Sequence, residues 1–147
     1  QQSGAKLNIS KNELNVIGVN KIKSVNISTK PYPGFPTDLQ SPFMSMMCLA
    51  DGISTIEENI FENRFQHVPE LEKMGAKITL SKKKAFITGI HTFEPAKLKA
   101  TDLRASMCLI LASLATHGKS EIFELEHLYR GYENIQNKLA NLGADIN

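Results

Sequence analysis

The sequence has 147 residues, of which 41% are hydrophobic, so it is long enough to bury one core of ordinary size. Its formal net charge of +2 is too small for a nucleic-acid-binding face, which usually concentrates Lys and Arg more heavily. The longest apolar run, residues 105–115, is about half as long as a membrane crossing requires. We therefore expect a cytoplasmic protein without a nucleic-acid or membrane partner.

An internal repeat organises the chain. The segment GAKLNIS, which begins at Gly4, aligns with GAKITLS, which begins at Gly75, at an offset of 71 residues. The triplet TDL at residues 37–39 likewise recurs at residues 101–103. Such repetition is typical of a duplicated structural unit, so we predict two consecutive copies of one unit.

A β-hairpin is expected near the start of the second copy. Residues 76–81 and 85–90 are short runs with β-branched residues, and a polar run of lysines separates them. Gly75 precedes the first run, and Gly143 has the same place at the end of the chain. Both glycines stand where a left-handed cap would end the preceding helix.

Two kinds of helix are expected in each copy. Residues 43–50 and 107–115 are apolar all the way round a helix, which predicts burial on every side. The second helix is amphipathic, as the spacing of Ile135, Leu139 and Leu142 indicates. The fold class is therefore α/β, with tandem βαβαββ units that enclose the apolar helix and place the sheet outside.

The repeat also predicts the domain organisation. We place the two units at about residues 4–74 and 75–142. Because residues 1–147 begin and end at nearly the same phase of the repeat, we expect a longer protein that extends in both directions. Two units taken from such a protein would leave an apolar helix face uncovered, so we expect self-association through that face.

Most catalytic signatures are absent from the sequence, including a glycine-rich phosphate loop, HExxH and paired CxxC. Cys48 and Cys108 lie in apolar helical runs and are expected to be buried thiols. The histidines show no metal-ligand spacing, and we interpret each as a surface or capping residue. They are His67, His91, His117 and His127. We predict neither a metal nor a cofactor.

Asp38 and Asp102 open the two apolar helices. The favoured interpretation of each is an N-cap, whose carboxylate accepts amide hydrogens of the first helical turn. Several prolines stiffen the approach to Asp38, which would also suit a positioned base. The N-cap interpretation is therefore stronger for Asp102 than for Asp38.

Three arginines are the other candidates for chemistry. Arg64 and Arg130 follow the two aspartates by 26 and 28 residues, and Arg104 lies in the first turn of a buried helix. An arginine in such a setting needs an anionic partner. The candidate partners within the chain are Glu62, Asp102 and Glu133. Alternatively, the arginines form a cationic cluster for phosphate or carboxylate, which a guanidinium binds through two hydrogen bonds.

Four motifs in the same order resemble the UDP-N-acetylglucosamine 1-carboxyvinyltransferases, a family of enolpyruvyl transferases. They are FPTDLQ from Phe35, FENRFQHVPEL from Phe61, ATDLRAS from Ala100 and LYRGYENI from Leu128. The resemblance implies a bacterial enzyme of peptidoglycan precursor synthesis, which transfers enolpyruvyl from phosphoenolpyruvate to the sugar 3-hydroxyl and releases phosphate. It implies two domains, each an inside-out α/β barrel of three units with helices inside. This chain would then be most of the second domain.

The resemblance also implies roles for particular residues. Asp38 matches the carboxylate proposed to deprotonate the sugar hydroxyl, and Thr37 lies beside it. Ile60 matches a position that contacts the nucleotide sugar. The arginines that match those neutralising phosphoenolpyruvate are Arg64, Arg104 and Arg130. Asp38, Arg104 and Arg130 are thus the candidate catalytic residues, with Thr37, Ile60 and Arg64 as further substrate-binding candidates.

Two departures from the family pattern affect these expectations. Tyr129 replaces the aspartate that usually precedes the arginine of RGYE, so the family pattern does not specify the orientation of Arg130. The family's cysteine loop and the lysine of its first domain have no counterpart in this sequence. We therefore expect this chain alone to be inactive.

Two other interpretations stay open. The first is 3-phosphoshikimate 1-carboxyvinyltransferase, which has the same fold and chemistry, although FENRFQHVPEL disfavours it. The second is a non-catalytic repeat module that binds an anionic ligand or a partner protein. A longer protein without the cysteine loop would favour the second interpretation.

Overall fold

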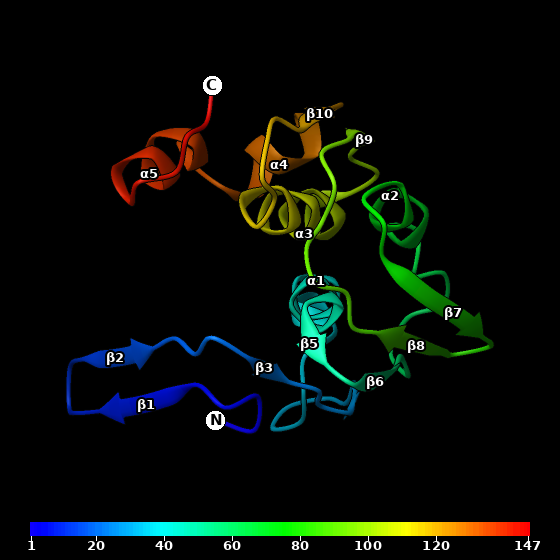
Figure 1. The fold of residues 1–147 in the computed structure, drawn as a ribbon. Helices are drawn as coiled ribbons and strands as arrows, with labels where there is room; N and C mark the ends of the chain where they lie inside the picture. The colour runs from blue at the N-terminus through cyan, green and yellow to red at the C-terminus, as the bar shows by residue number, and fades with distance from the viewer.

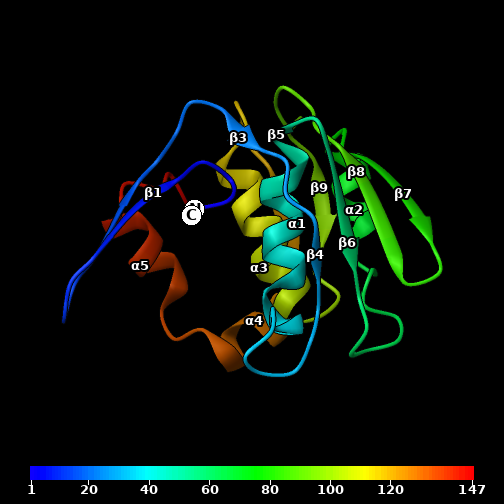
Figure 2. The same cartoon turned by 90° about the horizontal axis from the view of Figure 1, so that it is seen from below.

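Two helices lie side by side at the centre of the structure, a computed structural model that describes all residues from 1 to 147 (Figure 1). They are α1 (Gln40–Cys48) and α3 (Leu103–Leu114). Along one side of this helix pair lie the strands β4 (Ile27–Ser28), β6 (Ile53–Glu57) and β9 (Lys97–Lys99) (Figure 2). Strands β7 (Lys77–Ser81) and β8 (Lys84–Thr88) lie farther out. The fold is the α/β class predicted from the sequence, with helices inside and strands outside.

The larger sheet has four strands in the order β4-β6-β8-β7. Strand β4 (Ile27–Ser28) is parallel to β6 (Ile53–Glu57), whereas β8 (Lys84–Thr88) is antiparallel to both β6 and β7 (Lys77–Ser81). The hairpin expected from the repeat is therefore present as β7 and β8. Burial alternates along β8, which places one face of the sheet on the core.

Short parallel pairs flank the central helices. Strand β3 (Ile22–Lys23) pairs with β5 (Ala50–Asp51), and β9 (Lys97–Lys99) pairs with β10 (Glu121–Phe123). Helix α1 thus connects β4 to the parallel strand β6 by way of β5, and α3 connects β9 to the parallel strand β10. The two helices have corresponding places between parallel strands. The unit boundaries at about residues 4–74 and 75–142 stay a prediction.

The remaining elements are a hairpin and three short helices. Strands β1 (Lys6–Ile9) and β2 (Leu14–Ile17) form an antiparallel pair that extends away from the central helices (Figure 1). The helices are α2 (Val68–Lys73), α4 (Glu126–Gly131) and α5 (Ile135–Asn141). None of the helices combines the length and the apolarity that a membrane span needs.

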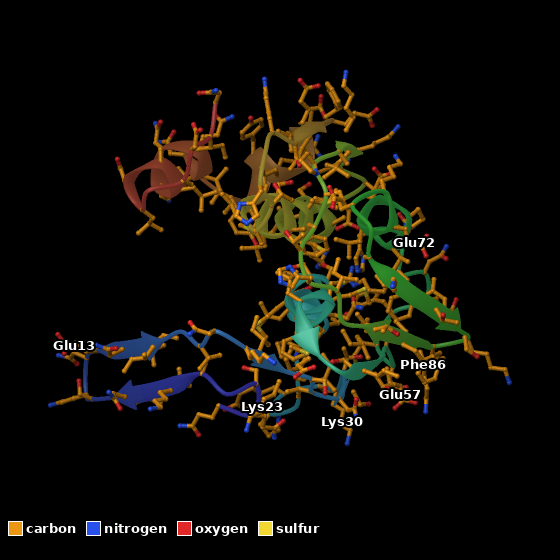
Figure 3. All side chains as sticks on the ribbon, viewed as in Figure 1. Glu13, Lys23, Lys30, Glu57, Glu72 and Phe86 are labelled. Carbon is orange, nitrogen blue, oxygen red and sulfur yellow. The ribbon has the colours of Figure 1, made fainter.

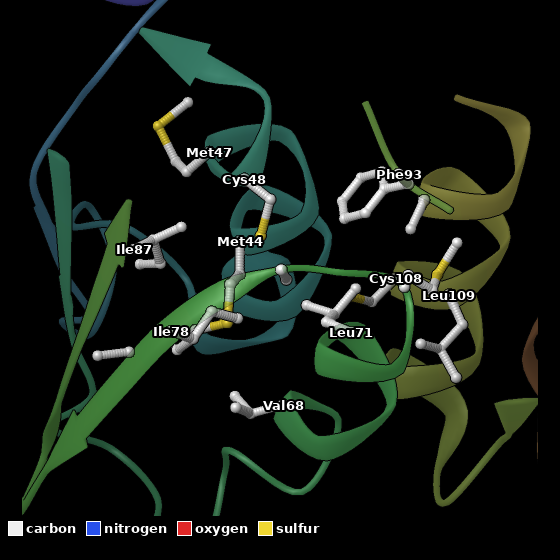
Figure 4. Packing of buried hydrophobic residues seen from close by; sticks show 14 of the residues in the cluster. Met44, Met47, Cys48, Val68, Leu71, Ile78, Ile87, Phe93, Cys108 and Leu109 are labelled. Carbon is white, nitrogen blue, oxygen red and sulfur yellow. The ribbon is translucent and has the colours of Figure 1, made fainter. Parts of the chain in front are cut away.

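The main core lies between the larger sheet and the central helices (Figure 4). Helix α1 contributes Met44, Met47 and Cys48, and α3 contributes Cys108 and Leu109, all with no solvent exposure. Burial of a large apolar side chain stabilises a fold by about 1.5–3 kcal/mol. The packing of the two helices in the core therefore fixes the position of the N-terminal end of α1 relative to that of α3.

Both cysteines are buried, as predicted. Burial raises the pKa of the Cys48 thiol to about 12, and it also raises the pKa of the Cys108 thiol. A thiol acts as a nucleophile only when it ionises. At neutral pH these two side chains therefore serve packing and not covalent chemistry.

The prediction that both central helices are buried on every side is wrong for α3. Leu111 and Leu114 are 40% and 43% exposed, because no element covers the outer face of this helix. Together with Leu39, Pro42 and Met46, Leu111 lines an apolar groove that runs over α1 and α3.

Helix ends follow the predicted chemistry at three of four positions. The Asp102 carboxylate accepts the N–H groups of Arg104 at 2.7 Å and Ala105 at 3.1 Å, so Asp102 is an N-cap. Gly75 and Gly143 have φ angles of +86° and +95°, as a left-handed cap requires.

Asp38 lies instead inside a 3₁₀ turn, Thr37–Leu39, and its side chain caps neither that turn nor α1. The favoured N-cap interpretation of Asp38 is therefore wrong.

His67 also differs from its prediction as a surface or capping residue. It precedes α2, but its side chain makes no capping hydrogen bond and is only 2% exposed. Its Nε2 lies 3.2 Å from Sδ of Met44. Burial lowers the pKa of His67 to about 4, although the nearby charge of Asp102 opposes this shift. The imidazole is therefore neutral at physiological pH.

The chain passes very close to itself where β8 ends. The N–H of Gly89 donates to the carbonyl oxygen of Gly52 at 2.9 Å. A Cβ atom at position 89 would overlap the carbonyl oxygen of Ala50 and lie 2.9 Å from the carbonyl carbon. Gly18 has the matching place in the first repeat, yet a Cβ atom there would meet no atom within 4 Å.

We expect Gly89→Ala to lower the free energy of unfolding by about 2 kcal/mol or more, because the backbone must shift to admit the methyl group. The matched variant Gly18→Ala should change it by less than about 0.5 kcal/mol. Urea unfolding followed by circular dichroism measures both values. Equal stabilities of the two variants would contradict the close approach at Gly89.

The buried His67 should make the protein less stable as the pH falls from about 6.5 toward 4, because only the unfolded state gains a proton there. Between pH 7.5 and 5, this histidine should account for a loss of about 2 kcal/mol in the free energy of unfolding. His67→Gln should remove that part of the pH dependence, whereas His91→Gln, at an exposed position, should retain it. An unchanged pH dependence in His67→Gln would exclude this role.

Candidate functional site

Three of the predicted site residues meet where the central helices begin. Asp38 lies in the 3₁₀ turn directly before α1, and Arg104 lies in the first turn of α3. Arg64 comes from the loop between β6 and α2. Because α1 packs against α3, the turns at their N-terminal ends come together although they are 66 residues apart.

Asp38 is held between the two arginines through a single oxygen. Its Oδ1 accepts a hydrogen bond from Nε of Arg104 at 2.5 Å and one from Nη2 of Arg64 at 3.4 Å. The side chain of Asp38 is 64% exposed, whereas those of Arg104 and Arg64 are 33% and 13% exposed. The other carboxylate oxygen accepts no hydrogen bond from the protein, so it can receive a donor from a ligand.

The arginines therefore pair with an aspartate that the ion-pair interpretation did not consider. That interpretation named Glu62, Asp102 and Glu133 as partners, and the structure pairs neither Arg64 nor Arg104 with any of them. Two guanidinium groups share one carboxylate oxygen, so most of their N–H groups have no acceptor in the protein. Guanidinium N–H groups of this kind favour a phosphate or carboxylate ligand.

Thr37 connects this cluster to a buried carboxylate. Its hydroxyl oxygen accepts a hydrogen bond from Nε of Arg64 at 3.2 Å and donates to Oε2 of Glu58 at 3.0 Å. Glu58 is only 2% exposed. Glu58 is not among the site residues predicted from the sequence, although its position indicates burial: it continues the alternation of Ser54 and Ile56, which face the core.

The loop after β6 contributes an apolar surface to the same site. Ile60 is 38% exposed and Phe61 is 53% exposed. The guanidinium carbon of Arg64 lies 4.5 Å from the centre of the Phe61 ring, a geometry that supports a cation–π interaction. The loop can therefore offer apolar contact beside the charged cluster.

Arg130 lies at the end of α4 and forms neither a hydrogen bond nor an ion pair with the cluster. It is exposed, and the neighbouring hydroxyl of Tyr129 accepts from Nε2 of Gln136 at 3.4 Å. The next residue, Gly131, is so close to Leu103 that an added Cβ atom would lie 2.6 Å from Cδ1 of that leucine. The end of α4 is thus near the start of α3, but the structure does not join the Arg130 side chain to the cluster.

The chemistry of the site is that of a cationic cluster around an exposed carboxylate. No group of three or more His, Cys, Asp or Glu side chains is arranged to hold a metal ion. The carboxylate can accept a proton, and the arginines can bind an anion. The arrangement suits proton abstraction from a hydroxyl beside a bound phosphate or carboxylate.

Comparison with known proteins identifies relatives of this chain. Residues 1–139 match the family model described as EPSP synthase (3-phosphoshikimate 1-carboxyvinyltransferase). The UDP-N-acetylglucosamine 1-carboxyvinyltransferase of Geotalea uraniireducens is 54% identical over 146 residues, which are 99% of this chain and 35% of that protein. The protein of the same name from Pelagibacter ubique is 55% identical over 143 residues, which are 97% of this chain and 34% of that protein. The chain spans about a third of the length of these curated relatives.

Solved structures of enolpyruvyl transferases share the fold. The enolpyruvyl transferase NikO from Streptomyces tendae superposes with a TM-score of 0.91 at 30% identity, covering 99% of this chain and 34% of that chain. An EPSP synthase from Acinetobacter baumannii gives a TM-score of 0.64 at 18% identity, covering 85% of this chain and 31% of that chain. The resemblance inferred from four sequence motifs is thereby confirmed. The chain belongs to the EPSP synthase family of carboxyvinyltransferases.

Proposed function

We propose that this chain is part of a UDP-N-acetylglucosamine 1-carboxyvinyltransferase. In this reaction the 3-hydroxyl oxygen of the sugar bonds to C2 of phosphoenolpyruvate while the methylene carbon gains a proton. The bond from C2 to the phosphate oxygen then breaks, the methyl group returns a proton, and inorganic phosphate leaves. The observation that carries the proposal is the exposed carboxylate of Asp38, held between Arg64 and Arg104. The names of the relatives at about 54% identity support the choice of sugar.

Asp38 is the proposed acceptor of the hydroxyl proton. An unperturbed aspartate has a pKa of about 3.9, so it is a weak base for a sugar hydroxyl. It would act as the C–O bond forms and the hydroxyl becomes more acidic, in a site from which most water has been excluded. The hydrogen bonds from Arg64 and Arg104 to Oδ1 would orient the other oxygen toward the sugar.

The arginines are the proposed ligands of phosphoenolpyruvate and of the intermediate. Arg64 and Arg104 retain guanidinium N–H groups that no acceptor in the protein uses, and Arg130 would add a further guanidinium once its exposed side chain turns toward the start of α3. Donors already aimed at the developing charge stabilise a transition state without reorganisation. We place Thr37 and Ile60 against the nucleotide sugar, beside this charged group.

Further expectations depend on the same proposal. The reaction would belong to peptidoglycan precursor synthesis in the bacterial cytoplasm. The full-length enzyme, meaning a longer protein that carries this chain, would supply the cysteine loop and the opposite wall of the cleft. The chain alone would then be inactive.

Removing the Asp38 carboxylate should reduce phosphate release by about 100-fold or more in the full-length enzyme, because a general base contributes roughly that factor. Asp38→Ala and Asp38→Asn should behave alike, since both lack the base. Asp51→Ala is the control, because the Asp51 side chain is 74% exposed and forms only a surface ion pair with Lys21. Near-normal turnover in both Asp38 variants would exclude Asp38 from the chemistry.

A shikimate phosphate substrate is the second candidate, because the family model carries that name. Calorimetric titration of the full-length enzyme should detect UDP-N-acetylglucosamine binding and no binding of 3-phosphoshikimate. The opposite result would replace the proposed sugar. If neither compound binds, the non-catalytic anion-binding module becomes the better explanation.

We also propose that the chain alone associates with a second copy through the apolar groove over α1 and α3. Leu39 and Leu111, which line the groove, are 54% and 40% exposed. Light scattering should give a mass above the 16.3 kDa of one chain, and the mass should fall in Leu111→Lys. A stable monomer at high concentration would contradict this association.

A further inference from the structure

Glu58 is a buried carboxylate directly beneath the candidate site. It follows β6, where Ser54 and Ile56 are fully buried, and it is itself 2% exposed. It forms no ion pair with any lysine, arginine or histidine. A buried carboxylate without a cation is costly unless hydrogen bonds replace its hydration. The hydrogen bonds of Glu58 must therefore offset the free-energy cost of burying its carboxylate.

Four donors converge on this carboxylate. Oε1 accepts hydrogen bonds from the hydroxyl of Thr29 at 2.9 Å, from the N–H of Ile60 at 2.8 Å and from the N–H of Phe61 at 3.1 Å. Oε2 accepts a hydrogen bond from the hydroxyl of Thr37 at 3.0 Å. Glu58 thus joins the turn that carries Asp38 to the loop that carries Ile60 and Phe61.

The direction of the Thr37 hydrogen bond determines what Arg64 can do. Because the hydroxyl proton of Thr37 points to Glu58, a lone pair of the same oxygen is free to accept Nε–H of Arg64. Phe61 provides the second connection. Its backbone N–H donates to Glu58, and its ring lies against the guanidinium group of Arg64. Glu58 therefore acts on Arg64 from two sides without touching it.

We propose that Glu58 is a positioning residue, which aims Arg64 at Asp38 and the substrate anion through Thr37 and the Ile60–Phe61 backbone. This inference rests on the proposed function and adds to it a residue that touches neither substrate. A guanidinium misplaced by about 1 Å loses much of its effect on the reaction, so a residue of this kind controls turnover from outside the site.

Glutamine cannot replace Glu58 because its amide has one accepting end and one donating end. If the NH₂ group faces Thr37, the threonine hydroxyl loses the acceptor for its own proton. If the NH₂ group faces the loop, it opposes the N–H groups of Ile60 and Phe61. The first orientation turns the hydroxyl proton of Thr37 away from residue 58 and changes how its oxygen receives Arg64, and the second leaves a donor facing a donor in a buried place.

The test uses the full-length enzyme with phosphoenolpyruvate and UDP-N-acetylglucosamine. Wild-type turnover checks the proposed function first. Glu58→Gln should then lower kcat per folded molecule by about tenfold or more, as expected for a misplaced catalytic group. The control is Glu57→Gln at the adjacent residue, which points outward from β6 and bonds to Ser28 and Lys84 (Figure 3). It should keep the wild-type kcat, and an equally unaffected Glu58→Gln would overturn the inference.

A second variant tests the same connection without changing Glu58. Thr37→Val keeps the shape of the side chain and removes the hydroxyl, so it should also lower kcat about tenfold. Thr37→Ser, which keeps the hydroxyl, should have most of the wild-type kcat. The double variant Thr37→Val with Glu58→Gln should have a kcat only slightly lower than that of either single variant. A merely structural role would lower the melting temperature and leave kcat per folded molecule unchanged. Additive effects of the two changes would contradict action through Thr37.

Crystal structures of the variants provide a measurement that does not depend on activity. In Glu58→Gln and Thr37→Val, Nε of Arg64 should move beyond the hydrogen-bond limit of about 3.5 Å from the side chain of residue 37. An unmoved Arg64 would overturn the inference even in an active enzyme. If the wild-type enzyme shows no turnover with these substrates, only the proposed function is contradicted. The position of Arg64 in the crystal structures would still decide the role of Glu58.

Discussion

The packing of α1 against α3 is the interaction on which the site depends. Asp38 lies just before one helix and Arg104 lies in the first turn of the other, so the contact between the helices brings a carboxylate and a guanidinium group together. Cys48 of α1 and Cys108 of α3 are neighbours in this contact, and both belong to the buried core. Loss of this apolar contact would therefore separate the charged side chains.

Around that contact, polarity changes in steps from the core to the solvent. Glu58 is buried and bonded only to neutral donors, Arg64 is mostly buried, and Asp38 is mostly exposed. Such a gradient fixes the inner groups firmly, because an unsatisfied buried polar group is costly. It leaves the outermost carboxylate oxygen available to a ligand. The same surroundings therefore provide both rigidity and access.

Local chemistry explains why some predictions from the sequence were correct and others were not. The Asp102 cap, the β7–β8 hairpin and the glycine-ended helices depend on contacts between near neighbours in the chain, which residue type and spacing encode directly. Asp38 shares the TDL triplet with Asp102, yet it does not cap a helix. Its neighbours in space are Arg64 and Arg104, and the triplet contains no information about them.

The sequence alone determined the α/β class, the internal repeat, the two buried thiols and the family resemblance, because each depends on periodicity or on contiguous motifs. Only the tertiary structure decided that Arg64 and Arg104 share Asp38, that α3 has an uncovered face, and that His67 is buried. Glu58 belongs partly to each group. The alternation along β6 indicates that it is buried, and the N–H groups of Ile60 and Phe61 are its near neighbours in the chain. Its other donors, Thr29 and Thr37, reach it only when distant segments pack together, which no pattern along the chain specifies.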